Sequence, residues 1–246
     1  MPASPLRIGT AGWSVPSSYA GEAPGNGSYL QRYAGRFNAV EINSSFYRPH
    51  QRKTYERWAQ ATPRDFRFSV KLPKAVTHEN RLRDCEALLD RFASEATGLG
   101  DKLGVLLMQL PPSFRLDEDV ASRFLHDLRE RLGAPVAVEP RHSSWFKPGV
   151  DQWLAGLGVA RVAADPARGD GADKPGGWSG LAYYRWHGSP RIYYSNYDAA
   201  ALASLKKEIE ASRGGGSEVW CVFDNTALGA AFGNALELSR MVEAGA

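Results

Sequence analysis

The chain has 246 residues, of which 43% are hydrophobic and 23% are charged, and its formal net charge is +3. These values are typical of a folded globular protein and exclude a disordered chain or a fibrous repeat. A charge this small does not by itself indicate nucleic-acid binding. No apolar run approaches the roughly 18 residues of a membrane helix.

The first residues lack a basic stretch followed by an apolar core, so we expect no secretory signal. Cys85 and Cys221 stand far apart and form no Cys-x-x-Cys pair, which is typical of a reducing compartment. The sequence therefore predicts a cytoplasmic protein without a membrane segment.

Short apolar runs alternate with helical patterns along the chain. The runs predict eight strands, at residues 6–10, 39–43, 66–72, 104–110, 136–139, 159–163, 181–186 and 218–223. Capping residues and apolar spacing predict helices after Ser28, Asp84, Asp117 and Asp198, another around Tyr55 and Trp58, and a closing helix over 228–242. Strands separated by crossovers of about 20–40 residues are typical of an α/β fold of the (β/α)8 barrel type, with an open doubly wound sheet as the alternative.

Residues 166–180 interrupt this pattern. They are rich in glycine, aspartate and proline and show no helical periodicity. We therefore expect the sixth helix to be missing or replaced by a loop. No internal repeat or domain boundary is visible, so residues 1–246 are interpreted as a single TIM-type barrel domain, irregular around the sixth helix.

Positive charge is concentrated in residues 31–83, which contain 12 Lys or Arg and four acidic residues, a local charge of +8. Such a segment attracts anions, although a solvated helix face is the commoner explanation. Nucleic-acid binding therefore stays open as an alternative function, and that binding would weaken steeply with added salt.

Polar and aromatic residues follow almost every predicted strand. The carboxyl ends of barrel strands build the active site, so we expect these side chains to meet at one mouth. Charged groups in apolar strands are costly unless they are paired, and four such residues stand in or beside strands: Glu41, Lys71, Glu139 and Arg185. A buried salt-bridge network is the alternative to a ligand site.

The residue types at the strand ends predict a pocket for a small or nucleotide-like anion. Lys71, Arg141 and Arg185 would hold its phosphate or carboxylate group. The further candidate binding residues are Trp13, Asn43, Tyr47, Gln109, His142, Trp145 and Asn225.

Two carboxylates and two histidines could transfer protons in such a pocket. Glu139 or Glu41 would act as the general base. His187 or His78 would act as the general acid, because imidazole titrates near neutral pH. No dinucleotide fingerprint or phosphate loop is present, which favours a hydrolase or isomerase over a redox enzyme. A barrel that binds a ligand without catalysis is the alternative.

A bound metal would use the same groups. Glu41, Glu139, Asp165, His78 and His187 offer oxygen and nitrogen ligands suited to zinc, manganese or iron. No His-x-x-x-His spacing is present, and the neighbouring lysine and arginines would oppose a cation. A metal is therefore possible but not favoured, and no other cofactor is indicated.

Several of these segments carry a shared pattern. They are IGTAGW at 8–13, VEINSSFY at 40–47, FSVKLP at 68–73 with TH at 77–78, QLPPSF at 109–114, EPRHSSW at 139–145, RWHG at 185–188 and FDN at 223–225. Together they resemble the YecE-like family, also called domain of unknown function 72, over nearly the whole chain. The resemblance implies a TIM-type barrel and a shared pocket, but no reaction. One departure is Asp224, where the family pattern often has Asn.

Overall fold

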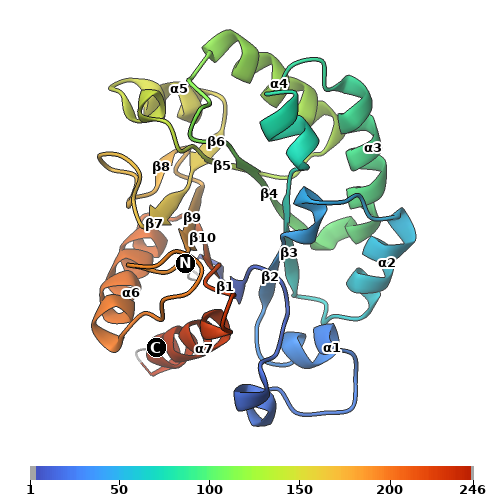
Figure 1. The fold of residues 1–246 in the computed structure, drawn as a ribbon, viewed down its shortest axis with the longest axis vertical. Helices are drawn as coiled ribbons and strands as arrows, with labels where there is room; N and C mark the ends of the chain where they lie inside the picture. The colour runs from blue at the N-terminus through green and yellow to red at the C-terminus, as the bar shows by residue number, and fades with distance from the viewer. Residues whose placement is uncertain (1–3, 245–246) are drawn as a thin grey trace.

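Parallel strands alternate with helices in the computed structural model, which describes residues 4–244 (Figure 1). The strands are β1 (Leu6–Thr10), β2 (Ala39–Ile42), β3 (Arg67–Lys71), β4 (Leu103–Gln109), β5 (Val136–Glu139), β6 (Val159–Arg161), β7 (Ala163–Asp165), β8 (Gly176–Gly177), β9 (Leu181–Trp186) and β10 (Glu218–Phe223). The α-helices are α1 (Tyr29–Ala34), α2 (Arg52–Gln60), α3 (Glu86–Ala96), α4 (Glu118–Arg131), α5 (Val150–Gly156), α6 (Ala199–Gly214) and α7 (Ala230–Glu243). Shorter helical turns are η1 (Ser17–Glu22), η2 (Ser44–Phe46), η3 (Ala75–Glu79), η4 (Thr97–Lys102) and η5 (Ser143–Phe146). No helix among these described residues is long and apolar enough to cross a lipid bilayer.

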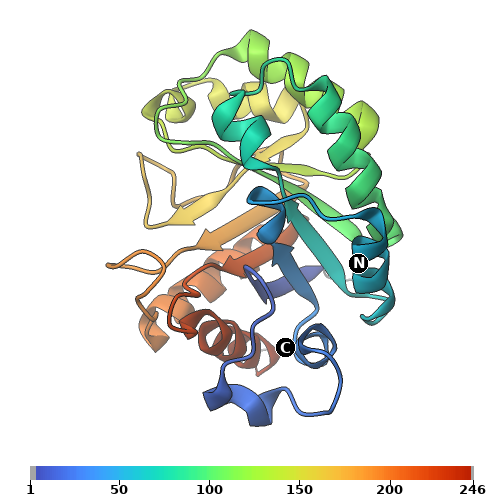
Figure 2. The same cartoon turned by 45° about the vertical axis from the view of Figure 1, so that its right-hand side comes forward.

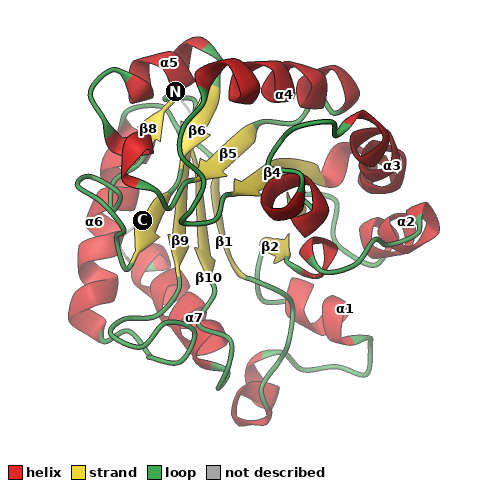
Figure 3. Ribbon diagram, turned by 45° about the horizontal axis from the view of Figure 1, so that its top comes forward, coloured by secondary structure: helices red, strands yellow, loops and turns green. Residues whose placement is uncertain are grey.

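The strands form two sheets, with the orders β1-β10-β9-β7 and β2-β3-β4-β5-β6-β8. The pairings are parallel, apart from the antiparallel contact of β8 with β6. The sheets meet at a bridge between Ala11 and Glu41. They also meet at Val162, between β6 and β7, whose amide donates to the Val138 carbonyl at 2.8 Å. The result is an α/β fold with parallel sheets in a TIM-barrel-like arrangement, with helices outside the strands (Figures 1 and 3).

Alternation along the strands places polar side chains above an apolar layer. Residues two apart on a strand share a face. Ala137 and Tyr183 belong to an apolar cluster built almost entirely from strand residues. The next residues on the same faces, toward the carboxyl ends of β5 and β9, are Glu139 and Arg185. A larger apolar cluster includes the inward sides of the helices.

Most helix starts follow the capping residues in the sequence. The side chains of Ser28, Asp117 and Asp198 accept backbone hydrogen bonds at the starts of α1, α4 and α6, which confirms those predictions. The prediction for Asp84 is wrong, because Cys85 takes the N-cap position of α3. Asp84 instead lies in a tight turn with a φ of 50°.

The sixth βα unit is irregular. The strand predicted over 159–163 is divided into β6 and β7, which pair in different sheets. Residues 166–180, all within the described part of the chain, contain no helix, as the sequence predicts, and their β8 folds back on β6. The loop after β7 and the loop after β9 project on the same side of the molecule (Figure 2). The short helix α5 has only two buried apolar residues, too few for a periodic signal.

Candidate functional site

The guanidinium of Arg185 lies at the centre of a buried ion-pair cluster at the carboxyl ends of the strands. It belongs to β9, and its side chain is completely buried. Its Nε and Nη2 donate to the two oxygens of Glu41, at 2.9 and 2.8 Å. Its Nη1 donates to Glu139 at 2.9 Å, and Nη2 also lies 3.0 Å from Asp224. All three guanidinium nitrogens are therefore bound to carboxylates of the protein.

His187 lies between two carboxylates of this cluster. Its Nε2 is 3.2 Å from Glu139, and its Nδ1 is 3.0 Å from Asp224. Glu139 Oε1 also accepts hydrogen bonds from Arg141, from Nε at 2.9 Å and from Nη2 at 2.8 Å. Both ring nitrogens of His187 are thus held by acids, while Nη1 of Arg141 keeps its donors free of partners within residues 4–244.

The charges of the cluster determine its protonation. Burial on its own raises the pKa of Glu139, but the cations around it, first His187 and then Arg185, hold that pKa well below its usual value. Burial lowers the pKa of His187, but Glu139 and a hydrogen bond to Asp224 outweigh it, so the pKa is raised. The imidazole therefore keeps its proton to higher pH than a free histidine does.

A tyrosine and a serine support the cluster on the side of the apolar layer. The Tyr183 hydroxyl lies 3.0 Å from Glu41 Oε2 and 2.9 Å from Ser69 Oγ. Because a carboxylate can only accept, Tyr183 donates to Glu41. Glu41 is completely buried and both its oxygens are bound, so it is poorly placed to act as a base on a ligand.

The ammonium of Lys71 lies beside the cluster without a carboxylate partner. Its side chain is 5% exposed, and it makes no ion pair or hydrogen bond with the described residues 4–244. Its Nζ lies 4.2 Å from the ring centroid of Phe46. Burial, and then the charge of Arg185, lower the pKa of Lys71 to about 8. On the neighbouring strand, the amide of Gln109 is likewise unpaired in this part of the chain and only 7% exposed.

His78 lies close to Lys71 and is uncharged at neutral pH. It belongs to η3, and its ring lies 4.9 Å from that of Phe46 in an edge-on arrangement. Burial, followed by the charges of Lys71 and Arg141, lowers the pKa of His78 to about 4. Its Nδ1 is 2.9 Å from the Thr77 hydroxyl. At pH 7 this imidazole is neutral, so it can accept a proton but cannot act as a general acid.

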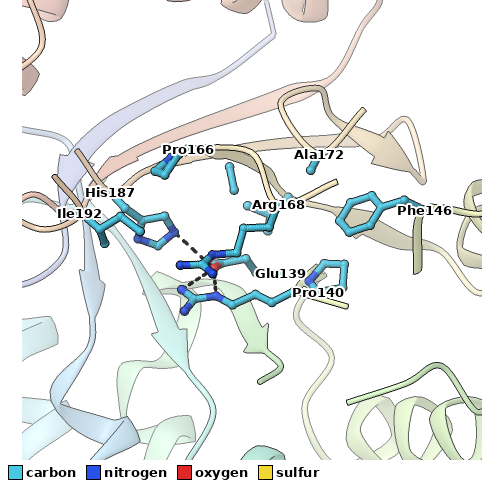
Figure 4. Close-up of a pocket in the computed structure, with 11 residues that line it drawn as sticks. Glu139, Pro140, Phe146, Pro166, Arg168, Ala172, His187 and Ile192 are labelled. Atoms are coloured by element: carbon cyan, nitrogen blue, oxygen red, sulfur yellow. Dashed lines mark hydrogen bonds and ion pairs between the residues drawn. The ribbon is translucent and has the colours of Figure 1, made fainter. Parts of the chain in front are cut away.

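A narrow pocket opens beside Glu139 (Figure 4). Its polar lining includes Glu139, Arg141 and His187, and its apolar lining includes Phe146. Figure 4 shows the side chain of Arg168 extending from the loop after β7 toward Glu139. The pocket has room for about one ordered water molecule, so it admits a single polar group and not a ring.

Two predicted binding residues are part of the core. Trp145 is completely buried, and its indole nitrogen donates to the Phe114 carbonyl at 3.1 Å. Asn225 is also completely buried, and its amide nitrogen donates to Ser195 and Asn234. Both side chains therefore hold the surrounding loops together, while the Oδ1 of Asn225 is buried without a partner in the described part of the chain. Ligand contact by either residue stays a prediction.

Four other predicted binding residues lie outside the ion-pair cluster. Trp13 packs edge-on against another tryptophan at 5.0 Å. Tyr47 is largely exposed, and Asn43 has a buried Oδ1 without a partner in the described part of the chain. His142 Nδ1 accepts from the backbone amide of Ser144 at the start of η5. Their contact with a ligand stays a prediction.

Some residues of the site were not selected from the sequence as binding or catalytic residues. Asp224 stands out in the sequence as a departure from the family pattern, and Tyr183 and Ser69 lie inside predicted strands. Period-two alternation could have found the last two, since they precede Arg185 and Lys71 by two residues on the same strands. Tyr193 of the loop after β9, whose ring is edge-on to His187 at 6.0 Å, gives no such signal.

The acidic residues do not form a metal site. Within residues 4–244, no three His, Cys, Asp or Glu side chains are grouped as metal ligands. The nearest grouping is Glu139, His187 and Asp224, where Arg185 binds both acids and both imidazole nitrogens are occupied. Asp165 accepts instead from the Tyr197 hydroxyl at 2.6 Å. The donor set therefore does not fit a metal ion.

The protein is of the α/β class, with parallel sheets in a TIM-barrel-like arrangement and a charged cluster at the strand ends. The chain belongs to the family described as protein of unknown function DUF72, whose model matches residues 7–246. This match confirms the family resemblance carried by the sequence motifs.

Curated relatives share about a third of their aligned residues with this chain. The UPF0759 protein YecE of Escherichia coli K12 is 33% identical over 142 residues, which are 55% of this chain and 52% of that protein. The UPF0759 protein YunF of Bacillus subtilis is 30% identical over 150 residues, or 58% of this chain and 53% of that protein. The chain spans about half the length of the curated relatives it matches.

Solved structures support the same fold. A DUF72 family protein from Thermotoga maritima (TM1631) has a TM-score of 0.77 and 25% identity, with 97% of this chain and 99% of that chain covered. One from Enterococcus faecalis (EF0366) has a TM-score of 0.79 and 21% identity, with 98% of each chain covered. A sugar phosphate isomerase/epimerase from Parabacteroides distasonis has a TM-score of 0.53 and 13% identity, over 97% of this chain and 94% of that one. The last two likenesses, below 25% identity, concern the fold alone.

Proposed function

We propose that the protein is an enzyme, a hydrolase or isomerase, that transfers protons on a small or nucleotide-like anionic substrate at the mouth of the strands. The observation that carries this proposal is Lys71, a residue only 5% exposed whose ammonium has no carboxylate at bonding distance among residues 4–244. A buried charge without a partner is costly. An anionic ligand would supply the missing partner, with the free amide of Gln109 beside it.

The cluster then acts as a support for the chemistry. Arg185 has its nitrogens bound to carboxylates, so it positions Glu41 and Glu139 and does not hold the substrate. His187 donates a proton to a substrate oxygen that takes the place of Glu139 or Asp224 at one of its ring nitrogens. His78, uncharged beside Lys71, accepts a proton from a water molecule in hydrolysis or from a carbon atom in isomerisation. In hydrolysis, exchange with solvent then removes the proton from His78 and returns one to His187. In isomerisation, His78 gives its proton to the neighbouring carbon while His187 recovers its proton from the substrate oxygen.

Binding of small anions to single variants tests the proposal. Phosphorylated and carboxylated metabolites are screened by thermal shift and then by NMR for product. We expect at least one anion to raise the Tm of the wild type and of Lys207→Met, a control on the exposed face of α6. Lys71→Met should lose that response, and His187→Gln should bind without turnover. An unchanged response in Lys71→Met would overturn the proposal, whereas binding without product in the wild type would favour a ligand-binding protein.

The proposal extends to the fold as one closed barrel, in which β6 and β7 together form the sixth strand position. Its support is the pair of junctions between the sheets, at Ala11 with Glu41 and at Val162. The amide of Gly12 donates to the Glu41 carbonyl at 2.8 Å. Slow hydrogen exchange at both Gly12 and Val162 would fit a closed ring, and rapid exchange at either amide would contradict it.

Nucleic-acid binding through residues 31–83 has less support. Lys74 lies 3.2 Å from Glu79, and Arg83 lies 2.9 Å from Asp117, so part of the local positive charge is already neutralised. Binding of a short DNA or RNA duplex that falls steeply between low and high salt would nevertheless favour this alternative.

A further inference from the structure

The loop that replaces the sixth helix brings an unpaired cation over the narrow pocket. Arg168 lines this pocket together with Glu139, Arg141 and His187 (Figure 4). It makes no ion pair or hydrogen bond with the described residues 4–244. Its charge therefore faces a pocket in which the protein offers it no carboxylate at bonding distance.

The carboxylate in that pocket is already neutralised. Glu139 binds the guanidinium groups of Arg141 and Arg185 and the imidazole of His187. Adding Arg168 leaves an excess of positive charge around the opening, with free donors on Arg141 Nη1 as well. Such an arrangement favours a second anionic group, and the small size of the pocket limits that group to the oxygen of a phosphate or carboxylate.

The two unpaired cations belong to different places in the site. Lys71 stands at the end of β3, close to Phe46 and His78, and it does not line the narrow pocket. Arg168 comes from the loop after β7 and lines that pocket. A ligand that neutralises both cations would therefore carry an anionic group at each of the two places.

We infer that Arg168 is a substrate-binding residue and that the substrate carries an anionic group at each of two ends. One end would bind Lys71 and Gln109, and the other would enter the narrow pocket beneath Arg168. The class is that of small bisphosphates, phosphorylated acids and dicarboxylates. This inference rests on the proposed function, because it takes Lys71 as the first anchor.

Calorimetric titration of variants of the 246-residue chain tests the inference with two probes. The probes are inorganic phosphate and a series of alkane bisphosphonates that differ in carbon-chain length. The variants are Arg168→Gln, Lys71→Met and Lys174→Gln, which removes an exposed cation from the same loop. We expect one bisphosphonate length to bind the wild type and Lys174→Gln more tightly than phosphate does. Arg168→Gln and Lys71→Met should each raise its Kd at least about tenfold.

The possible outcomes separate this inference from the proposed function. If Arg168→Gln binds the bisphosphonates as Lys174→Gln does while Lys71→Met loses affinity, the inference is overturned and the Lys71 anchor stands. If Arg168→Gln loses affinity and Lys71→Met does not, the role of Arg168 in ligand binding is supported, and the proposed function, which depends on Lys71, fails. If phosphate and every bisphosphonate leave the wild type unbound, both are overturned. Because Arg168 is exposed, its variant should keep the Tm of the wild type without ligand.

Discussion

Arg185 and Glu41 form a two-pronged ion pair, at 2.8 and 2.9 Å, in which both side chains are completely buried. The geometry is that of a planar guanidinium matched to a carboxylate, which lysine cannot reproduce. The residues come from strands in the two different sheets. The pair therefore joins the sheets through charge as well as through the backbone bridge at Glu41.

Removing the guanidinium should destabilise the protein strongly. Arg185→Met leaves Glu41, Glu139 and Asp224 without their shared counter-charge, so we expect the free energy of unfolding to fall by about 3–5 kcal/mol. Urea unfolding followed by circular dichroism measures the change. Arg91→Met, which removes the exposed member of an i,i+4 helix pair with the half-buried Glu95, should change it by less than about 1 kcal/mol. Equal effects of the two variants would contradict the buried cluster.

Removing the ammonium of Lys71 should have the opposite effect. Its pKa is lowered to about 8, so the unfolded chain binds this proton more tightly than the folded protein does. Below pH 8, where Lys71 is charged in both states, this difference in proton affinity lowers the free energy of unfolding by its full amount, on the order of 3 kcal/mol. We expect Lys71→Met to be more stable than the wild type at pH 7, and the difference to shrink as the pH rises from 8 toward 10. A less stable Lys71→Met at pH 7 would show that the ammonium has a partner.

The pH dependence of stability should reveal the titration of the His187 imidazole. Its pKa is raised in the folded protein, so its stabilising contribution is complete below the unfolded value of about 6.5 and is lost as the pH rises through the folded value. In the Lys71→Met background, which removes the opposing titration, stability should fall with pH above about 6.5. His187→Gln in the same background should lack that fall. Parallel pH profiles of the two proteins would refute the charged imidazole.

Close approach of β1 to β2 should make Gly9 intolerant of a side chain. A Cβ at Gly9 would overlap the carbonyl oxygen of Ala39 and would lie 2.9 Å from the Tyr33 hydroxyl. Gly9→Ala should therefore lower the free energy of unfolding by about 1–3 kcal/mol or more. At Gly133, where a Cβ meets no atom within 4 Å, the same change should be neutral or stabilising. Thermal unfolding of both variants compares them directly.

The order of strands and helices could be predicted from the sequence because apolar runs and capping residues are local signals. Glu41, Glu139 and Arg185 could be placed together for a related reason, since charges inside apolar strands of one α/β fold must find partners. The division of β6 from β7 at Val162 could not be predicted, because it depends on which neighbouring strand each half pairs with. That pairing is a property of the assembled sheets.

The candidate site was predictable by position but less so by role. Arg185 has the residue type of an anion binder, yet its neighbours use every nitrogen. Trp145 follows a strand end as a ligand-stacking ring would, yet the core encloses it completely. Residue type and strand position do not distinguish a side chain that meets solvent from one covered by loops, because loop paths such as that of residues 166–180 leave no periodic pattern.

The distance along the chain between the partners of Arg185 has a consequence for biosynthesis. Glu41 precedes Arg185 by 144 residues and Glu139 precedes it by 46. A nascent chain that has left the ribosome only as far as β5 carries both acids in apolar strands. Their shared counter-ion, Arg185, has not yet emerged. Early compaction of that fragment is opposed by the two acids until β9 emerges. The cluster thus opposes tight collapse of an incomplete chain and stabilises the compact state once the last strands can join.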